Sequence, residues 1–173
     1  MKIGIDLSQT AFEETGVSNY TLRLVEKMIK NDKKNEYIIF FASLRKKLKL
    51  KISSSNIIVK TFPISPSMLD FLWNKIHIFP IEWFIGNIDI FICSDWTEPP
   101  VLRAKKITII HDMIVFTHPN NTDNNIVNTQ KRKLNWSKKE CNRFICVSES
   151  TKKDFIEIME IDAKKVSVIY PGA

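Results

Sequence analysis

Residues 106–112 read Lys-Ile-Thr-Ile-Ile-His-Asp, a short run of β-branched apolar residues that ends in His111 and Asp112. A run this short and this rich in Ile and Thr is typical of a buried strand rather than of a helix. In open α/β sheets, ligands bind just beyond the carboxyl ends of the strands. We therefore expect these two side chains where such a fold places its chemistry. An alternative stays open for each residue: His111 as a structural residue at a strand end, and Asp112 as the start of the next turn.

Strand and helix patterns alternate along the rest of the chain. The predicted strands are residues 3–7, 37–42, 57–62, 88–94, 107–111, 144–148 and 166–170. The predicted helices are 16–29, 68–78, about 125–141, and a last one that Ser148 or Ser150 caps and that ends near Glu160. Strands buried on both faces and separated by helices predict an α/β fold of the Rossmann-like, doubly wound kind, with a mostly parallel sheet and helices on both faces. The dinucleotide fingerprint Gly-x-Gly-x-x-Gly and the phosphate-loop motif are absent, so neither NAD nor ATP is expected.

Composition sets the class of protein and its partners. The chain has 173 residues, 44% of them hydrophobic, which is enough for one globular domain with a core. Its net charge of +7 favours polyanionic partners. The three cysteines lack the spacing of a metal site, so we expect free, buried thiols in a reducing compartment. A charge interrupts the apolar run at the N-terminus, so no signal peptide is expected and the predicted location is cytoplasmic.

Two segments bear on membrane contact. Residues 68–86 are the most apolar stretch, but their charged residues and Pro80 exclude a membrane-spanning helix. In residues 44–51, apolar residues alternate with basic ones. This pattern favours docking on an anionic membrane surface or an acidic glycan carrier, and a solvated surface face is the alternative. The basic residues concerned are Arg45, Lys46, Lys47, Lys49 and Lys51. No nucleic-acid partner is expected, because aromatic residues are not interleaved with this segment.

The first predicted helix opens on Thr15, Gly16 and Val17, after a strand that ends at Asp6 and Leu7. A glycine at a helix N-terminus lets a ligand approach the backbone, where free N–H groups and the helix dipole favour an anion. The alternative is an ordinary Thr or Ser N-cap that follows a tight turn.

Five motifs follow one another in register along the chain. They are residues 1–6 (Met-Lys-Ile-Gly-Ile-Asp), 15–21 (Thr-Gly-Val-Ser-Asn-Tyr-Thr), 109–112 (Ile-Ile-His-Asp), 145–152 (Ile-Cys-Val-Ser-Glu-Ser-Thr-Lys) and 165–172 (Lys-Val-Ser-Val-Ile-Tyr-Pro-Gly). With these motifs the chain resembles, over essentially its whole length, the N-terminal domain of a GT-B-fold glycosyltransferase of family 4. The resemblance implies one half of a GT-B fold, with an acceptor-binding domain at residues 1–170. It also implies that the interdomain hinge starts at residues 171–173 and that the donor domain is absent.

The resemblance also implies an activity and a set of site residues. The complete enzyme would transfer a hexose from a nucleotide-diphospho-sugar to a glycan or lipid-linked acceptor, with retention of configuration, in polysaccharide biosynthesis. It would use no metal or other cofactor, and this half would be inactive alone. The enzyme would be cytoplasmic and peripheral at the inner face of the membrane. His111 would be the catalytic residue that contacts the transferred sugar, and Gly16 would approach donor phosphate or acceptor. The other implied substrate-binding residues are Asp6, Thr15, Val17, Tyr20, Asp112, Ser148 and Glu149.

The chain departs from the family pattern at two cationic positions. Where relatives have Gly-Val-Gly-Arg-Tyr, this chain has Ser18 and Asn19 in place of the second Gly and the Arg, and Ser8 stands where relatives carry Arg. These losses bear on phosphate contact and acceptor type. A Glu-x7-Glu spacing at Glu149 and Glu157 lies on the wrong side of the hinge, and we interpret it as a coincidence on a solvated helix face.

Two other functions stay open at this point. The chain is alternatively a stand-alone acceptor-recognition or membrane-anchoring subunit that partners a separate donor-binding protein. A third hypothesis is a basic Rossmann-like domain that binds polyanions nonspecifically, which salt-dependent binding to duplex DNA would support.

Overall fold

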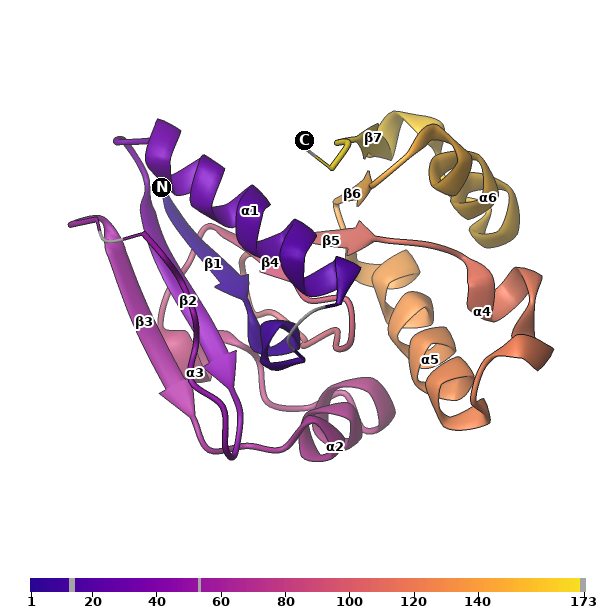
Figure 1. Cartoon of the computed structure of the whole chain (residues 1–173), viewed down its shortest axis with the longest axis horizontal. Coiled ribbons are helices and arrows are strands. Elements are labelled where there is room, and N and C mark those ends of the chain that lie inside the picture. The colour runs from indigo at the N-terminus through magenta and orange to yellow at the C-terminus, as the bar shows by residue number, and fades with distance from the viewer. Residues whose placement is uncertain (13–14, 53, 172–173) are drawn as a thin grey trace.

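The computed structural model describes residues 1–12, 15–52 and 54–171. In this part of the chain, seven strands form one parallel sheet in the order β3-β2-β1-β4-β5-β6-β7 (Figure 1). The strands are β1 (Lys2–Asp6), β2 (Glu36–Ala42), β3 (Ile57–Phe62), β4 (Ile90–Cys93), β5 (Lys105–Ile110), β6 (Arg143–Cys146) and β7 (Val166–Val168). The predicted Rossmann-like α/β fold is confirmed, and the sheet is parallel at every pairing of these strands.

Helical segments connect the strands. They are η1 (Ser8–Ala11), α1 (Gly16–Asn31), α2 (Pro66–Leu69), η2 (Asp70–Lys75), α3 (Glu82–Ile85), α4 (Ile114–Thr117), η3 (Pro119–Asn121), α5 (Asn124–Glu140), α6 (Glu149–Met159) and η4 (Ala163–Lys165). The helix expected at residues 68–78 begins two residues earlier and becomes π-helical at Asp70. It also ends sooner, because His77 and Phe79 adopt left-handed backbone angles, with φ of 59° and 63°.

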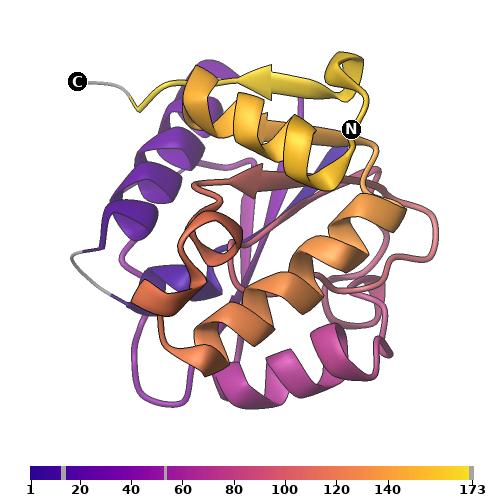
Figure 2. The same ribbon diagram turned by 90° about the vertical axis from the view of Figure 1, so that its right-hand side faces the viewer.

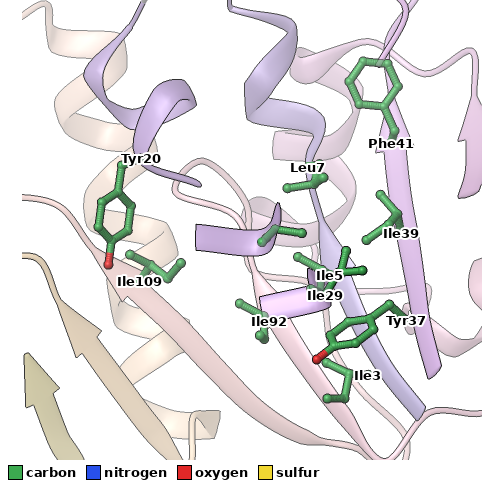
Figure 3. Close-up of a cluster of buried hydrophobic side chains, with 11 residues drawn as sticks. Ile3, Ile5, Leu7, Tyr20, Ile29, Tyr37, Ile39, Phe41, Ile92 and Ile109 are labelled. Carbon is green, nitrogen blue, oxygen red and sulfur yellow. The ribbon is translucent and has the colours of Figure 1, made fainter. Parts of the chain in front are cut away.

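The two faces of the sheet are covered by different helices. Figure 1 shows α1 in front of the sheet, where Ile29 packs with Ile5, Leu7 and Ile39 in one buried cluster (Figure 3). The opposite face packs against the segment after β3 and against α5 and α6 (Figure 2). The central strands β1, β2 and β4 are buried between these layers, which explains why their sequences read as nearly continuous apolar runs.

The strand order reverses at β1, which pairs with β2 on one side and with β4 on the other. In an open parallel sheet, such a switch point leaves a crevice at the carboxyl ends of the strands. The loops after β1 and β4 flank this crevice, and the loop after β5 lies next along the edge.

Gly4 in β1 has no room for a side chain. A Cβ atom there would lie 2.8 Å from Ile85 Cδ1 and 2.9 Å from both Ile88 Cδ1 and Phe91 Cδ2. We expect Gly4→Ala to destabilise the fold by about 1–3 kcal/mol in urea unfolding, because it overpacks the core. Gly16→Ala is the matched control, since a Cβ there meets nothing within 4 Å. Equal effects of the two substitutions would contradict this explanation.

The structure also bears on two compositional predictions. Cys93, Cys141 and Cys146 are free and buried, as expected. Among the described residues, no helix is both long enough and apolar enough to cross a membrane.

Candidate functional site

Two helix N-termini meet the carboxyl edge of the sheet. Thr15 caps α1, since its side chain accepts a hydrogen bond from Ser18 N at 3.1 Å. Ser148 caps α6 in the same way, and its Oγ accepts from Thr151 N at 3.0 Å. The Thr151 hydroxyl then donates to the carbonyl oxygen of His111 at 3.2 Å. The cap geometry expected as the alternative for Thr15 is therefore present, and the Thr151 hydrogen bond ties the start of α6 to the end of β5.

The imidazole of His111 packs against Tyr20 of α1. The two rings meet edge to face, with centroids 5.3 Å apart and planes at 88°. The Tyr20 hydroxyl donates to the carbonyl oxygen of Ile169 at 2.9 Å, so α1 also holds the C-terminal segment. Two side chains 91 positions apart in the sequence are thus brought into contact.

His111 has an unused nitrogen. Its Nε2 atom is buried and has no hydrogen-bond partner among the residues that the structure describes. Burial lowers the pKa of His111 below its ordinary value; Asp95 and Asp112 oppose this shift, whereas Lys133 adds to it. The ring is therefore neutral at pH 7, and a neutral imidazole offers one donor and one acceptor. Because a buried polar atom without a partner carries a free-energy cost, the unpartnered Nε2 marks this ring as a candidate functional group.

Asp6 organises the loops beneath this edge. Its Oδ1 accepts from the backbone N and the Oγ of Ser8, at 2.8 and 2.6 Å, and its Oδ2 accepts from Thr97 Oγ1 at 3.3 Å. Burial raises the pKa of the Asp6 carboxyl above its ordinary value, although these hydrogen bonds oppose the shift. Ser8 Oγ also accepts from Ala42 N at 2.9 Å. Ser8, which stands where relatives carry Arg, is thus the hydrogen-bonding partner of Asp6. Together, Ser8 and Asp6 connect the loop after β1 to the end of β2 and to the loop after β4.

The other expected substrate-binding residues lie at the margin of the edge. Asp112 is exposed, and its Oδ1 accepts from Ile114 N at 2.9 Å, which is the turn described above as its alternative role. Glu149 is exposed in the first turn of α6. Gly16 is exposed and Val17 is half-buried at the start of α1. The structure therefore brings Tyr20 and His111 into direct contact, with Gly16 one helical turn from Tyr20.

Asp95, which sequence reasoning missed, lies at the same edge. Gln9 Oε1 accepts from Asp95 N, and Gln130 Nε2 donates to Asp95 O at 3.0 Å. Gln9 Nε2 also donates to Thr21 Oγ1 of α1 at 2.8 Å. This network holds Asp95 where its charge acts on His111. A signal was present, because Asp95 directly follows its predicted strand just as Asp112 follows the next one.

A cluster of buried charges lies between β5 and α5. Glu98 is fully buried, with Lys106 Nζ 3.0 Å from Oε1 and Lys133 Nζ 3.9 Å from Oε2. Lys106 also donates to Glu140 Oε2 at 2.8 Å, and Lys133 donates to Thr108 Oγ1 at 2.6 Å. His77 Nε2 lies 2.7 Å from Glu140 Oε1, which joins the segment after β3 to this cluster. The charges thus fix α5, and with it Gln130, against the sheet.

The basic segment at residues 44–51 lies in the β2–β3 connection. Leu48 and Leu50 pack against the buried cluster under α1, so their alternation with lysines follows from packing on the sheet. The outward side chains are Arg45, Lys46, Lys47, Lys49 and Lys51. Contact of this segment with a membrane or an acidic carrier stays a prediction.

The last motif is only partly described. Its strand is β7, after which Ile169 N donates to Cys146 O at 3.0 Å. Gly172 and residue 173 of the expected hinge lie outside the described residues.

Comparison with known proteins decides the family. The model of Glycosyltransferase Family 4 matches residues 15–173. The chain belongs to this family. The match includes four of the five motifs in full, and the resemblance inferred from them is confirmed. Family 4 membership supports glycosyltransferase function in general.

The chain was also compared with curated proteins and with solved structures. No curated protein matches the chain. Among solved structures, an alpha-glucosyltransferase in complex with UDP and a 13-mer DNA containing a HMU base aligns with 100% of this chain and 43% of its own, at 16% sequence identity and a TM-score of 0.48. The chain therefore spans less than half the length of that glucosyltransferase.

Within the described residues, no group of three or more His, Cys, Asp or Glu side chains is arranged to hold a metal ion.

Proposed function

We propose that this domain is the acceptor-binding N-terminal half of a retaining glycosyltransferase. The complete enzyme would transfer a hexose from a nucleotide-diphospho-sugar to a glycan or lipid-linked acceptor, without a metal. Family membership supports glycosyl transfer. The observation that carries the assignment of the site is the buried, unpartnered Nε2 of His111 at the end of β5, in a ring that packs on α1.

The chemistry follows from the two kinds of group at this edge. Backbone N–H groups at Gly16 and the dipole of α1 favour the charge that develops on the leaving diphosphate. The neutral His111 ring hydrogen-bonds a hydroxyl of the transferred sugar and so orients its anomeric carbon toward the acceptor. Closure of the donor-binding half over this edge excludes water, so the sugar reaches the acceptor rather than water.

Gly16→Ala in the complete enzyme tests this arrangement. Nothing lies within 4 Å of a Cβ at this position, so the free energy of unfolding is expected to stay within about 0.5 kcal/mol of the wild type. If donor phosphate approaches the backbone there, the added methyl group is expected to lower labelled-sugar transfer by about tenfold. Transfer at the wild-type rate would remove Gly16 from the site.

A second experiment tests whether the acceptor-binding half is inactive without the donor-binding half. Residues 1–173 alone are expected to release no nucleoside diphosphate from any nucleotide-sugar, whereas the complete enzyme does so when acceptor is present. NMR of the product reports the anomeric configuration, and an inverted linkage would contradict the proposed stereochemistry. Turnover by residues 1–173 alone would contradict the assignment to the acceptor-binding half.

A further inference from the structure

A groove of about 980 Å³ runs along α1. One wall is α1, the opposite wall is the C-terminal segment from Ile169 to Pro171, and Lys51 and Ile52 of the β2–β3 connection close a third side. Figures 1 and 2 both show the segment directly after β7 running toward α1. At one end the groove reaches Gly16 and Tyr20, which belong to the candidate site.

The groove is strongly basic. Arg23, Lys27 and Lys30 follow one another at helical spacing on α1, and Lys51 faces them from the loop. All four side chains are exposed, and none forms an ion pair with a carboxylate in the part of the chain that the structure describes. The one acidic lining residue, Glu26, accepts from Lys51 N at 2.9 Å. Cations that lack internal partners and converge on one groove favour an anionic ligand.

The same groove has an apolar surface. Leu24 and Ile52 are half-buried in the core cluster under α1 and also line the groove. On the other wall, Tyr170 is 62% exposed and is followed by Pro171. A soluble anion would use the cations alone, whereas a hydrocarbon chain joined to a phosphate would use both surfaces.

The groove is joined to the candidate site by one side chain. Tyr20 lines the groove, packs on the His111 ring, and hydrogen-bonds Ile169 O on the opposite wall. A ligand lying along α1 therefore has one end next to the groups proposed to handle the sugar.

We propose that this groove binds a lipid-linked acceptor, with its phosphate or diphosphate on Arg23, Lys27, Lys30 and Lys51 and the first part of its hydrocarbon chain on Leu24, Ile52 and Tyr170. The acceptor sugar then extends past Tyr20 toward His111. This inference rests on the proposed function and names the acceptor class for that site.

Binding of farnesyl diphosphate to the 173-residue chain tests the groove. Isothermal titration is expected to give an affinity at least tenfold higher than for inorganic pyrophosphate or for farnesol, because only the first probe presents both chemistries. The triple substitution R23A/K27A/K30A is expected to weaken farnesyl diphosphate binding by at least about tenfold, since each cation near the phosphates contributes. The matched control, K153A/K164A/K165A, removes the same charge from exposed positions around α6 and is expected to change binding less than twofold.

Three results would overturn the proposal. Pyrophosphate binding as tight as that of farnesyl diphosphate would make the groove a plain anion site. Equal losses in the two triple variants would make the binding nonspecific. Tighter binding of an acidic oligosaccharide, such as oligogalacturonate, would make the acceptor a glycan. None of these measurements needs sugar transfer. Loss of farnesyl diphosphate binding in an active enzyme therefore overturns the groove alone, whereas failure to transfer to any acceptor overturns the proposed function.

Discussion

Replacing Glu98 with Ala is expected to destabilise the fold by about 3–5 kcal/mol, because it leaves buried lysines without their shared counter-charge. Lys106 is fully buried and Lys133 is nearly so, and both face the Glu98 carboxylate. Burial by itself would raise the pKa of Glu98, but Lys106 and Lys133, with hydrogen bonds from Cys93 and Ser137, hold it below its ordinary value. The carboxylate is therefore charged at neutral pH. Among the described residues, its removal leaves the buried Lys133 without a carboxylate partner and leaves Lys106 with Glu140 alone.

Urea unfolding monitored by tryptophan fluorescence measures this effect. Glu157→Ala removes the same side chain from an exposed position on α6 and is expected to cost no more than about 0.5 kcal/mol. The double substitution E98L/K106M removes a pair of opposite charges together and is expected to recover part of the loss, because buried ion pairs are often replaceable by apolar residues of similar size. A Glu98→Ala variant as stable as Glu157→Ala would show that this cluster does not stabilise the protein.

Much of the architecture could be predicted from the sequence, because burial of strands and helices leaves periodic apolar patterns. β3 has the predicted bounds, and α5 is displaced by one residue from the prediction. The four-residue helices α3 and α4 were not predicted, since one turn is too short to show a helical period. The end of η2 was also misplaced. It depends on His77, whose ring reaches Trp73 O and Glu140 from a distant part of the chain.

In the candidate site, too, features that depend on local sequence could be predicted, and features that depend on distant contacts could not. His111 could be proposed from the sequence because its place at a strand end is a local property. The buried charges that hold α5 could not be predicted, because Glu98, Lys106 and Lys133 come from three segments that meet only after folding. A lysine in an apolar strand is usually read as an exposed residue, yet Lys106 is buried because α5 covers that face of β5 with polar partners. Likewise, only the packing of α5 brings Gln130 to Asp95.

His111→Ala in the complete enzyme is expected to lower sugar transfer by about a hundredfold or more, with the fold intact. The imidazole is proposed to orient the sugar as the glycosidic bond forms, and loss of one positioned hydrogen-bonding group at a reacting centre typically has an effect of this size. Because the contact is proposed to matter most in the closed complex, the loss should appear in kcat rather than in KM for the acceptor. Steady-state transfer of a labelled sugar at saturating donor measures both constants.

His118→Ala is the matched control, because His118 is exposed and lies seven residues further along the chain. It is expected to transfer sugar at the wild-type rate.

Tyr20→Phe tests whether the contact of Tyr20 with His111 or its hydrogen bond to the C-terminal segment matters. This substitution keeps the edge-to-face contact with the His111 ring and removes only the hydrogen bond to Ile169 O. Its kcat is expected to stay within about threefold of wild type, because the loss of one hydrogen bond at the wall of the site costs about 0.5–1.5 kcal/mol in stability and leaves the reacting groups in place. If His111→Ala keeps wild-type kcat but unfolds more easily, the unpartnered nitrogen has no role in transfer and His111 is a structural residue of the β5 end.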